Sequence, residues 1–230
     1  MRILKIEKND AGQRLDKFLT KAVKGLPQSL MYKFLRTKKI KLNRKRAEPK
    51  TMLCEGDEVE LFIRDEFFDS PEADTSAYTR IEPKLDIVYE DENIILMDKK
   101  AGIIVHDDED EKINTLLNHM KAYLYKKGEY DYKNENSFVP SLCNRIDRNT
   151  EGIVIGAKNA QALKTINEMI KTREIKKYYL CLVKGKLKEK EATLTDYLVK
   201  NTEQNRVYVH STPQKDGKTI ITKYKVLKEG

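Results

Sequence analysis

The chain has 230 residues, of which 36% are charged and 39% hydrophobic, and its 45 Lys and Arg outnumber its 37 Asp and Glu to give a net charge of +8. No apolar run approaches the roughly 20 residues of a membrane-spanning helix, which excludes an integral membrane protein of that type. Three scattered cysteines, Cys54, Cys143 and Cys181, exclude a disulfide framework and a paired-cysteine zinc site. The positive charge favours a polyanion, usually nucleic acid, as partner. We expect a cytoplasmic protein with no membrane partner.

Residues 1–64 are predicted to form a small, basic N-terminal domain. Apolar residues recur at helical spacing from about 13 to 23, and Ser29 is the predicted N-cap of a second helix. Alternating apolar residues predict strands near Ile40 and across 59–63, with a basic turn at 43–46 between them. A Pro-, Ser- and Asp-rich stretch at 65–84 lacks periodicity and is typical of an exposed linker.

Residues 85–230 are predicted to form a second domain of mixed composition. Strands are expected at 85–91, 94–99, 152–156, 176–183, 206–209 and 219–227, and helices at 114–125 and 160–171. A polar loop is expected from 126 to 136, beside tyrosines that could stack on RNA bases or be simply solvated. Because many strands accompany only two helices, the predicted fold class is α+β with a mainly antiparallel sheet.

Basic side chains cluster on the N-terminal domain. Any single lysine is more often merely solvated, but a cluster on so small a domain is the footprint of a phosphate-binding surface. The string from Arg14 to Leu19, the Ser29-led helix, and the segments 39–43 and 56–59 resemble the S-four-type RNA-binding domain. That family usually has Asn-Gly in the turn where this chain has Asn43-Arg44. The resemblance implies an RNA-binding set of Arg14, Lys17, Lys33, Arg36, Lys39, Arg44 and Arg46.

The segment 144–152, Asn-Arg-Ile-Asp-Arg-Asn-Thr-Glu-Gly, is the candidate catalytic loop. Its Asp147 lies between Arg145 and Arg148, whose charges favour an ionised carboxylate. Such a carboxylate can act as nucleophile or stabilise charge, and arginines can hold RNA phosphates. An isolated motif of this kind is more often an ordinary salt bridge in a loop, so the motif alone does not establish a catalytic site.

The wider pattern resembles the RluA/RluC-type pseudouridine synthases, whose signature is His-Arg-Leu-Asp-Arg-x-Thr-Ser-Gly. Asn144, Ile146 and Glu151 depart from it. The stretch 88–106 resembles the family's opening motif, with Lys100 at the place of a proline, and 177–185 resembles a later strand motif. The resemblance implies that Asp147 is the catalytic carboxylate, paired with Arg145, that Tyr179 is the active-site tyrosine, and that Arg148 contacts RNA.

Family members usually continue beyond residues 219–227 into a Thr-Gly-Arg-x-His-Gln-Ile-Arg segment. The chain carries no such segment. We therefore expect the catalytic domain to be C-terminally incomplete, with an exposed strand edge.

The resemblance implies an RNA pseudouridine synthase that acts on large-subunit ribosomal RNA without a cofactor or metal. Two alternatives stay open: a synthase for transfer RNA, and a catalytically silent RNA-binding or ribosome-assembly protein. The chain lacks a dimerising heptad repeat, which predicts a monomer.

Overall fold

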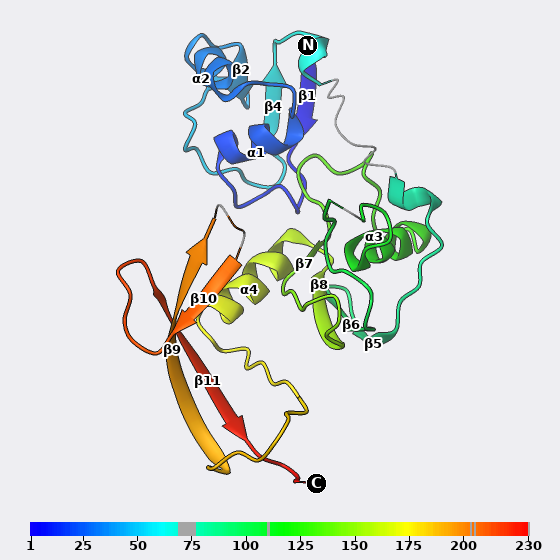
Figure 1. The fold of residues 1–230 in the computed structure, drawn as a ribbon. Coiled ribbons are helices and arrows are strands. Elements are labelled where there is room, and N and C mark those ends of the chain that lie inside the picture. The colour runs from blue at the N-terminus through cyan, green and yellow to red at the C-terminus, as the bar shows by residue number, and fades with distance from the viewer. Residues whose placement is uncertain (69–76, 110, 203, 205, 230) are drawn as a thin grey trace. The chain divides into compact units, whose positions relative to one another are not determined.

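The computed structural model describes residues 1–68, 77–109, 111–202, 204 and 206–229. The chain divides into two compact units, Met1–Lys176 and Lys177–Gly230. The first unit contains two hydrophobic cores, one in an N-terminal module (residues 1–68) and one in a central body (residues 77–176), while residues 177–229 form the C-terminal unit (Figure 1). All named strands pair antiparallel, which confirms the predicted α+β class. No helix within the described ranges is long and apolar enough to cross a bilayer.

The module packs two helices on a four-stranded sheet. Helix α1 spans Leu15–Ala22 and α2 spans Gln28–Arg36. The sheet has the order β1-β4-β2-β3, with β1 at Arg2–Lys5, β2 at Ile40–Leu42, β3 at Lys45–Arg46 and β4 at Glu58–Leu61. The apolar stripe of α1 is buried as predicted, since Leu15, Phe18 and Leu19 are fully inaccessible.

The module differs from its prediction at three points. The N-cap of α2 is Pro27, and Ser29 lies inside the helix, because proline has no N–H and therefore forfeits no intrahelical hydrogen bond at the start of a helix. Strand β1 was not predicted, and neither was β3, which contains Lys45 and Arg46 of the predicted basic turn 43–46. The turn between β2 and β3 keeps a tight hairpin form although Arg44 replaces the glycine of the resembling family: Asn43 and Arg44 both have positive φ, +50° and +64°.

The body is built on the sheet β5-β6-β8-β7. Its strands are β5 (Ile87–Glu90), β6 (Ile94–Lys99), β7 (Ser141–Leu142) and β8 (Gly152–Ala157), and its helices are α3 (Leu116–Lys126) and α4 (Ala160–Lys171). Helix α3 approaches β8 so closely that a Cβ on Gly156 would lie 2.3 Å from the Sδ of Met120. A side chain at this position would force Met120 or Ile95 to move, so the position favours glycine.

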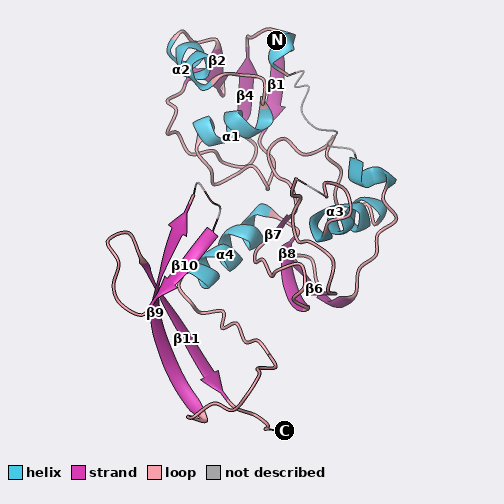
Figure 2. Cartoon of the chain, in the orientation of Figure 1, coloured by secondary structure: helices cyan, strands magenta, loops and turns pink. Residues whose placement is uncertain are grey.

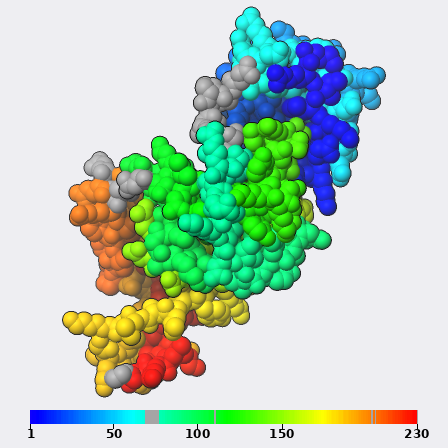
Figure 3. Space-filling view, turned by 90° about the vertical axis from the view of Figure 1, so that its right-hand side faces the viewer, coloured from blue at the N-terminus to red at the C-terminus, as the bar shows by residue number. Residues whose placement is uncertain are grey.

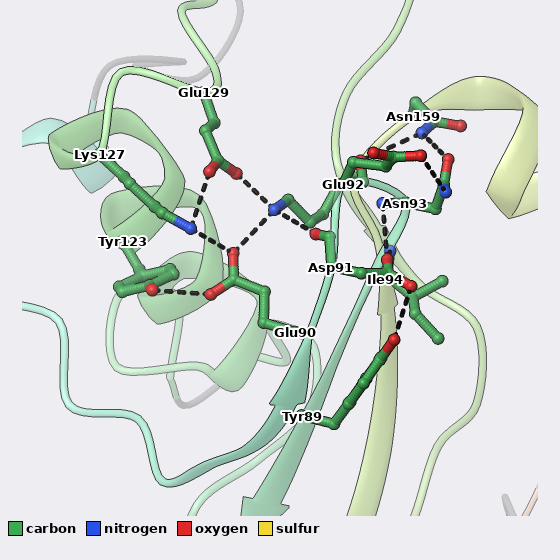
Figure 4. A network of polar contacts seen from close by, with 11 residues as sticks. Tyr89, Glu90, Asp91, Glu92, Asn93, Ile94, Tyr123, Lys127, Glu129 and Asn159 are labelled. Carbon is green, nitrogen blue, oxygen red and sulfur yellow. Dashed lines mark hydrogen bonds and ion pairs between the residues drawn. The ribbon is translucent and has the colours of Figure 1, made fainter.

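A cluster of charges ties β5, α3 and the start of α4 together (Figure 4). Lys158, whose side chain is 6% exposed, lies 2.7 Å from a carboxylate oxygen of Glu90 and 2.5 Å from one of Glu129. Lys127 contacts the same two carboxylates at 2.9 and 2.7 Å, and the Tyr123 hydroxyl donates to Glu90 at 2.8 Å. The charges neutralise one another, so we interpret the cluster as structural.

The tyrosines near the 126–136 loop belong largely to the body's core. Tyr78, only 4% exposed, has ring centroids of Tyr125, Tyr130 and Tyr132 at 6.0, 5.8 and 6.3 Å. Tyr130 is 5% exposed. Both expectations for this stretch, an RNA-stacking surface and a set of solvated tyrosines, are therefore wrong for Tyr130.

The C-terminal unit is a three-stranded sheet, β10-β9-β11. Its strands are β9 (Glu191–Asn201), β10 (Arg206–His210) and β11 (Lys218–Lys225). The last two confirm predictions, whereas β9 was not predicted. The strand predicted at 176–183 is wrong: the chain between α4 and β9 is loop, as Figure 2 shows. It pairs with no strand of the described chain, and Leu182 is fully exposed.

The predicted linker, 65–84, includes residues 69–76, which lie outside the described residues. Its two ends form short 3₁₀ helices, η1 at Asp65–Phe67 and η2 at Ala77–Arg80. Phe67 and Phe68 pack on the module's core and Tyr78 on the body's core. The domain boundaries at 64 and 85 stay a prediction.

Candidate active site

The loop that carries Asp147 connects β7 to β8, two antiparallel neighbours of the body's sheet. Its first residues extend the ladder, since the N–H of Cys143 donates to the carbonyl of Ile155 at 2.7 Å. The amide of Asn144 then accepts from the N–H of Ile155 at 2.8 Å and donates to the carbonyl of Ile153 at 3.3 Å. Asn144, which stands where the resembling family has histidine, thus fixes the start of the loop.

The end of the loop is fixed to the segment after β6. The carbonyl of Arg148 accepts from the N–H of Gly102 at 2.9 Å, and a carboxylate oxygen of Glu151 accepts from the N–H of Ala101 at 3.2 Å. Gly152, where the chain enters β8, has a φ of +129°, a backbone conformation that residues other than glycine rarely adopt. The loop is therefore held at both ends.

Lys99 is hydrogen-bonded to the backbone at the end of the loop and after β6. Its side chain is among the largest fully buried ones, with the residue 1% exposed. The ammonium donates to the carbonyls of Lys100 at 3.0 Å, Ile103 at 2.8 Å and Arg148 at 3.0 Å. All three of its donors are thus used by the backbone around the site.

Burial lowers the pKa of Lys99, because it penalises the charged form. The negative charges of Glu151 and Asp147 act in the opposite direction. The carboxylate of Asp147 thus lies within the electrostatic field of a buried cation that the backbone holds in place.

Asp147, Arg145 and Arg148 are brought together by the loop, and all three are exposed. In the part of the chain that the structure describes, no ion pair joins Asp147 to either arginine. The guanidinium of Arg148 instead lies 3.2 Å from a carboxylate oxygen of Asp108. The loop thus presents Asp147 to solvent, where a substrate can reach it.

The predicted RNA-binding residues of the module lie on its surface. Arg14 is only partly exposed there, and its side chain makes a two-point contact, at 3.0 and 2.5 Å, with the buried carboxylate of Asp16. Arg44 is exposed and lies 3.9 Å from the buried carboxylate of Glu60, a long contact that leaves the guanidinium accessible from solvent. The others, Lys17, Lys33, Arg36, Lys39 and Arg46, are exposed on α1, on α2, next to β2 and on the β2–β3 hairpin.

Comparison with known families identifies two parts of the chain. The family model for RNA pseudouridylate synthase matches residues 93–230, which include the whole candidate loop. The model for the S4 domain, the S-four domain of the sequence resemblance, matches residues 13–59.

The chain belongs to the RNA pseudouridylate synthase family.

The chain also aligns with several named synthases over most of its length. It is 33% identical over 94% of its length to an uncharacterized RNA pseudouridine synthase of Mycoplasma genitalium, and covers 66% of that protein. It is 39% identical over 77% of its length to one of Mycoplasma capricolum, covering 57% of it. It is 30% identical over 98% of its length to the ribosomal large subunit pseudouridine synthase C of Salmonella typhi, covering 67% of it. The chain therefore spans about two thirds or less of these relatives' lengths.

Tyr179, the predicted active-site tyrosine of this synthase-family chain, belongs to the C-terminal unit and is 61% exposed. Its role stays a prediction.

Two residues at the site were missed from sequence. Lys99 follows Ile95 and Met97 on the inward side of β6, and this alternation was a usable signal that its ammonium would be buried. Asp108 lies in the acidic run that starts at 107, directly after the opening motif, but nothing in that run pointed to Arg148.

Among the described residues, no group of three or more His, Cys, Asp or Glu side chains could hold a metal ion.

Proposed function

We propose that the protein converts uridine to pseudouridine in RNA, with Asp147 as the catalytic carboxylate. The observation that supports this most is the position of Asp147: exposed, on a loop anchored at both ends, inside the stretch that matches the synthase family. A rigid loop keeps a reactive group in place for a bound substrate. The S4 domain adds a basic surface for the RNA around the target.

The reaction rearranges bonds within one nucleotide. The bond from the sugar to N1 of uracil breaks, the base turns, and the sugar bonds to carbon five, whose hydrogen leaves to water while N1 gains a proton. The base must leave its stack first. The carboxylate of Asp147 can attack the sugar, attack the base or remove a sugar proton, and these alternatives stay open. Arg148 would occupy the space that the base leaves, and Tyr179 would stack on the extruded uracil.

We propose large-subunit ribosomal RNA as the substrate, because a relative at 30% identity is named as a synthase for it. The test is release of tritium from carbon five of uracil in transcribed ribosomal RNA, with transfer RNA as the matched substrate and the Salmonella synthase as positive control. Release from ribosomal RNA alone supports the proposal. Release from transfer RNA alone would mean that transfer RNA is the substrate instead. RNA binding without release from either supports the silent RNA-binding protein.

A further inference from the structure

The sheet of the N-terminal module has two faces with different surroundings. Successive side chains of a strand point to opposite faces of its sheet. On β4, Val59 and Leu61 are completely buried in the core that the module's helices share. Glu60 and, directly after the strand, Phe62 therefore lie on the other face, and so does Lys41, which is paired with Glu60. We call this second face, opposite α1 and α2, the open face of the module.

One row of side chains crosses all four strands on the open face. The register pairs Glu60 of β4 with Ile3 of β1 and with Lys41 of β2. Lys41 is paired in turn with Arg46 of β3. Ile3 is 49% exposed, and Arg46 is exposed as well. In the space-filling view, dark-blue atoms from the start of the chain adjoin cyan atoms from the region of β4 on the surface of the module (Figure 3). A partner can therefore reach this row from solvent.

Positive charge exceeds negative charge on the open face. Lys41 and Arg46 are directly opposite one another, and like charges in this arrangement destabilise a sheet unless an anion joins them. Among the residues that the structure describes, no ion pair involves either side chain. Glu60, which is buried, supplies one negative charge beside these two positive ones. The next row pairs Lys5 with Glu58, one charge of each sign, so the excess stays positive.

Phe62 adds an aromatic ring to the open face. The N–H of Phe62 donates to the carbonyl of Lys39 at 2.8 Å, so the residue continues the ladder of β4. It is 42% exposed, although phenylalanine is among the residues most often buried. The ammonium of Lys41 lies 5.2 Å from the centre of its ring, a cation–π contact. Arg44, in the turn of the β2–β3 hairpin, is a further cation, 3.9 Å from Glu60.

An exposed ring with cations beside it suits one kind of partner in particular. Unpaired nucleotides are bound by aromatic side chains that stack on their bases and by basic side chains that contact their phosphates. A base pair inside a duplex offers no free face to such a ring. The combination on the open face therefore favours a single-stranded nucleic acid over a duplex.

We propose that the open face binds unpaired nucleotides of the RNA, with Phe62 stacking on a base and with Lys41 and Arg46 contacting the adjacent phosphates. The inference rests on the proposed function for the identity of the nucleic acid as RNA. It adds Phe62 and Lys41 to the predicted RNA-binding residues. It also gives the module a second binding surface, on the other side of the sheet from the basic residues of α1 and α2.

The first test measures the binding of a fluorescein-labelled oligouridylate of about ten nucleotides, a length that a single-strand-binding domain can cover. Phe62→Ala should weaken binding about tenfold, because one base loses the ring on which it stacks. Phe62→Tyr should bind like the parent. Phe62→Leu keeps an apolar side chain without a ring, so it should lose as much affinity as Phe62→Ala. Parent-like binding by Phe62→Ala or by Phe62→Leu would overturn the proposal.

The second test examines the cations through the salt dependence of the same binding. Lys41→Gln should reduce the slope of log affinity against log salt by about 0.7, the value for one phosphate of a single strand. The matched control is Lys45→Gln. Lys45 is the neighbour of Arg46 on β3, but it is paired with Leu42, which packs on the core, and so it lies on the helical side of the sheet. This control should keep the parent's slope, and equal slopes for Lys41→Gln and Lys45→Gln would overturn the proposal.

The third test observes the stacking itself. The chain contains no tryptophan, so Phe62→Trp introduces a single indole on the open face. Its fluorescence should be quenched as the oligouridylate binds, and it should not change with a blunt RNA duplex, whose bases are already stacked. The anisotropy of the fluorescein label reports binding independently. An oligouridylate that is bound by this measure but leaves the indole unquenched would overturn the proposal.

The outcomes also separate this inference from the proposed function. Oligouridylate binding that depends on Phe62, without tritium release from any RNA, would keep the open face as a binding surface and remove the catalytic proposal. Tritium release by the parent, with oligouridylate binding that does not depend on Phe62, would do the opposite.

Discussion

The ammonium of Lys99 donates to the carbonyl of Arg148 at 3.0 Å, so the end of one buried strand supports the residue that follows the candidate catalytic aspartate. Two more carbonyls, of Lys100 and Ile103, complete the coordination of this cation. A buried cation is costly unless its donors are satisfied, and here the backbone of two loops satisfies them. The same three hydrogen bonds therefore stabilise the body and hold the backbone of the candidate site in place.

Lys99→Met should therefore impair both properties. Three carbonyls lose their partner, and we expect the free energy of unfolding to fall by about 2–4 kcal/mol. Because the loop also loses its support, tritium release should fall about tenfold to a hundredfold. Urea unfolding and release assays measure the two effects. Lys100→Met is the matched control, since Lys100 is half-exposed and pairs with Asp86 and Asp98, and it should change stability by less than about 1 kcal/mol. Parent-like stability of Lys99→Met would refute the supporting role.

Asp108→Asn should release the guanidinium of Arg148. The ion pair is about half exposed on both sides, so stability should change by less than about 1 kcal/mol. RNA affinity should rise about two- to fivefold, because one negative charge leaves a surface that binds phosphate. Filter binding at low salt measures this. An unchanged or lower affinity would show that Asp108 does not compete with RNA.

The charge cluster around Glu90 should make the body sensitive to acid. Burial raises the pKa of Glu90, but hydrogen bonds from Lys158, Lys127 and Tyr123 outweigh it and lower the pKa to about 2 from 4.5. A carboxylate whose pKa is lowered by folding stabilises the fold at every pH above its pKa in the unfolded chain. That contribution is lost as the pH falls from about 4.5 to about 2. The contribution is about 3 kcal/mol. Chemical denaturation between pH 7 and pH 2 should show this loss in the parent. Glu90→Gln should have a flatter profile, and an equally steep profile would exclude Glu90 as its cause.

Gly156→Ala tests the packing of α3 on β8. The new methyl would meet Met120 and Ile95 at 2.3 and 2.8 Å, so we expect a loss of about 1–3 kcal/mol. Adding Met120→Ala makes room for the methyl. The double variant should therefore be more stable than the sum of the two single effects predicts, as thermal unfolding would show. Strict additivity would mean that Met120 is not the obstacle.

The elements predicted best from the sequence are those defined by a local repeat of apolar residues. The stripe of α1, the helix α4 and the β5–β6 hairpin follow from local periodicity. The strand predicted at 176–183 has the right residues, but a strand needs a partner for its backbone hydrogen bonds, and periodicity does not supply one. The support of the loop by Lys99 also depends on contacts distant in sequence: its bond to Arg148 spans 49 residues. The candidate loop was found through its motif, while its anchoring required the structure.

The central claim is that Asp147 performs the isomerisation, and counting the product tests it most directly. Transcribed large-subunit ribosomal RNA is incubated with the parent or with Asp147→Asn, digested to nucleosides, and its pseudouridine quantified by chromatography. The account predicts pseudouridine from the parent and none from Asp147→Asn, although both bind the RNA equally. Equal amounts of pseudouridine from the two proteins would contradict it.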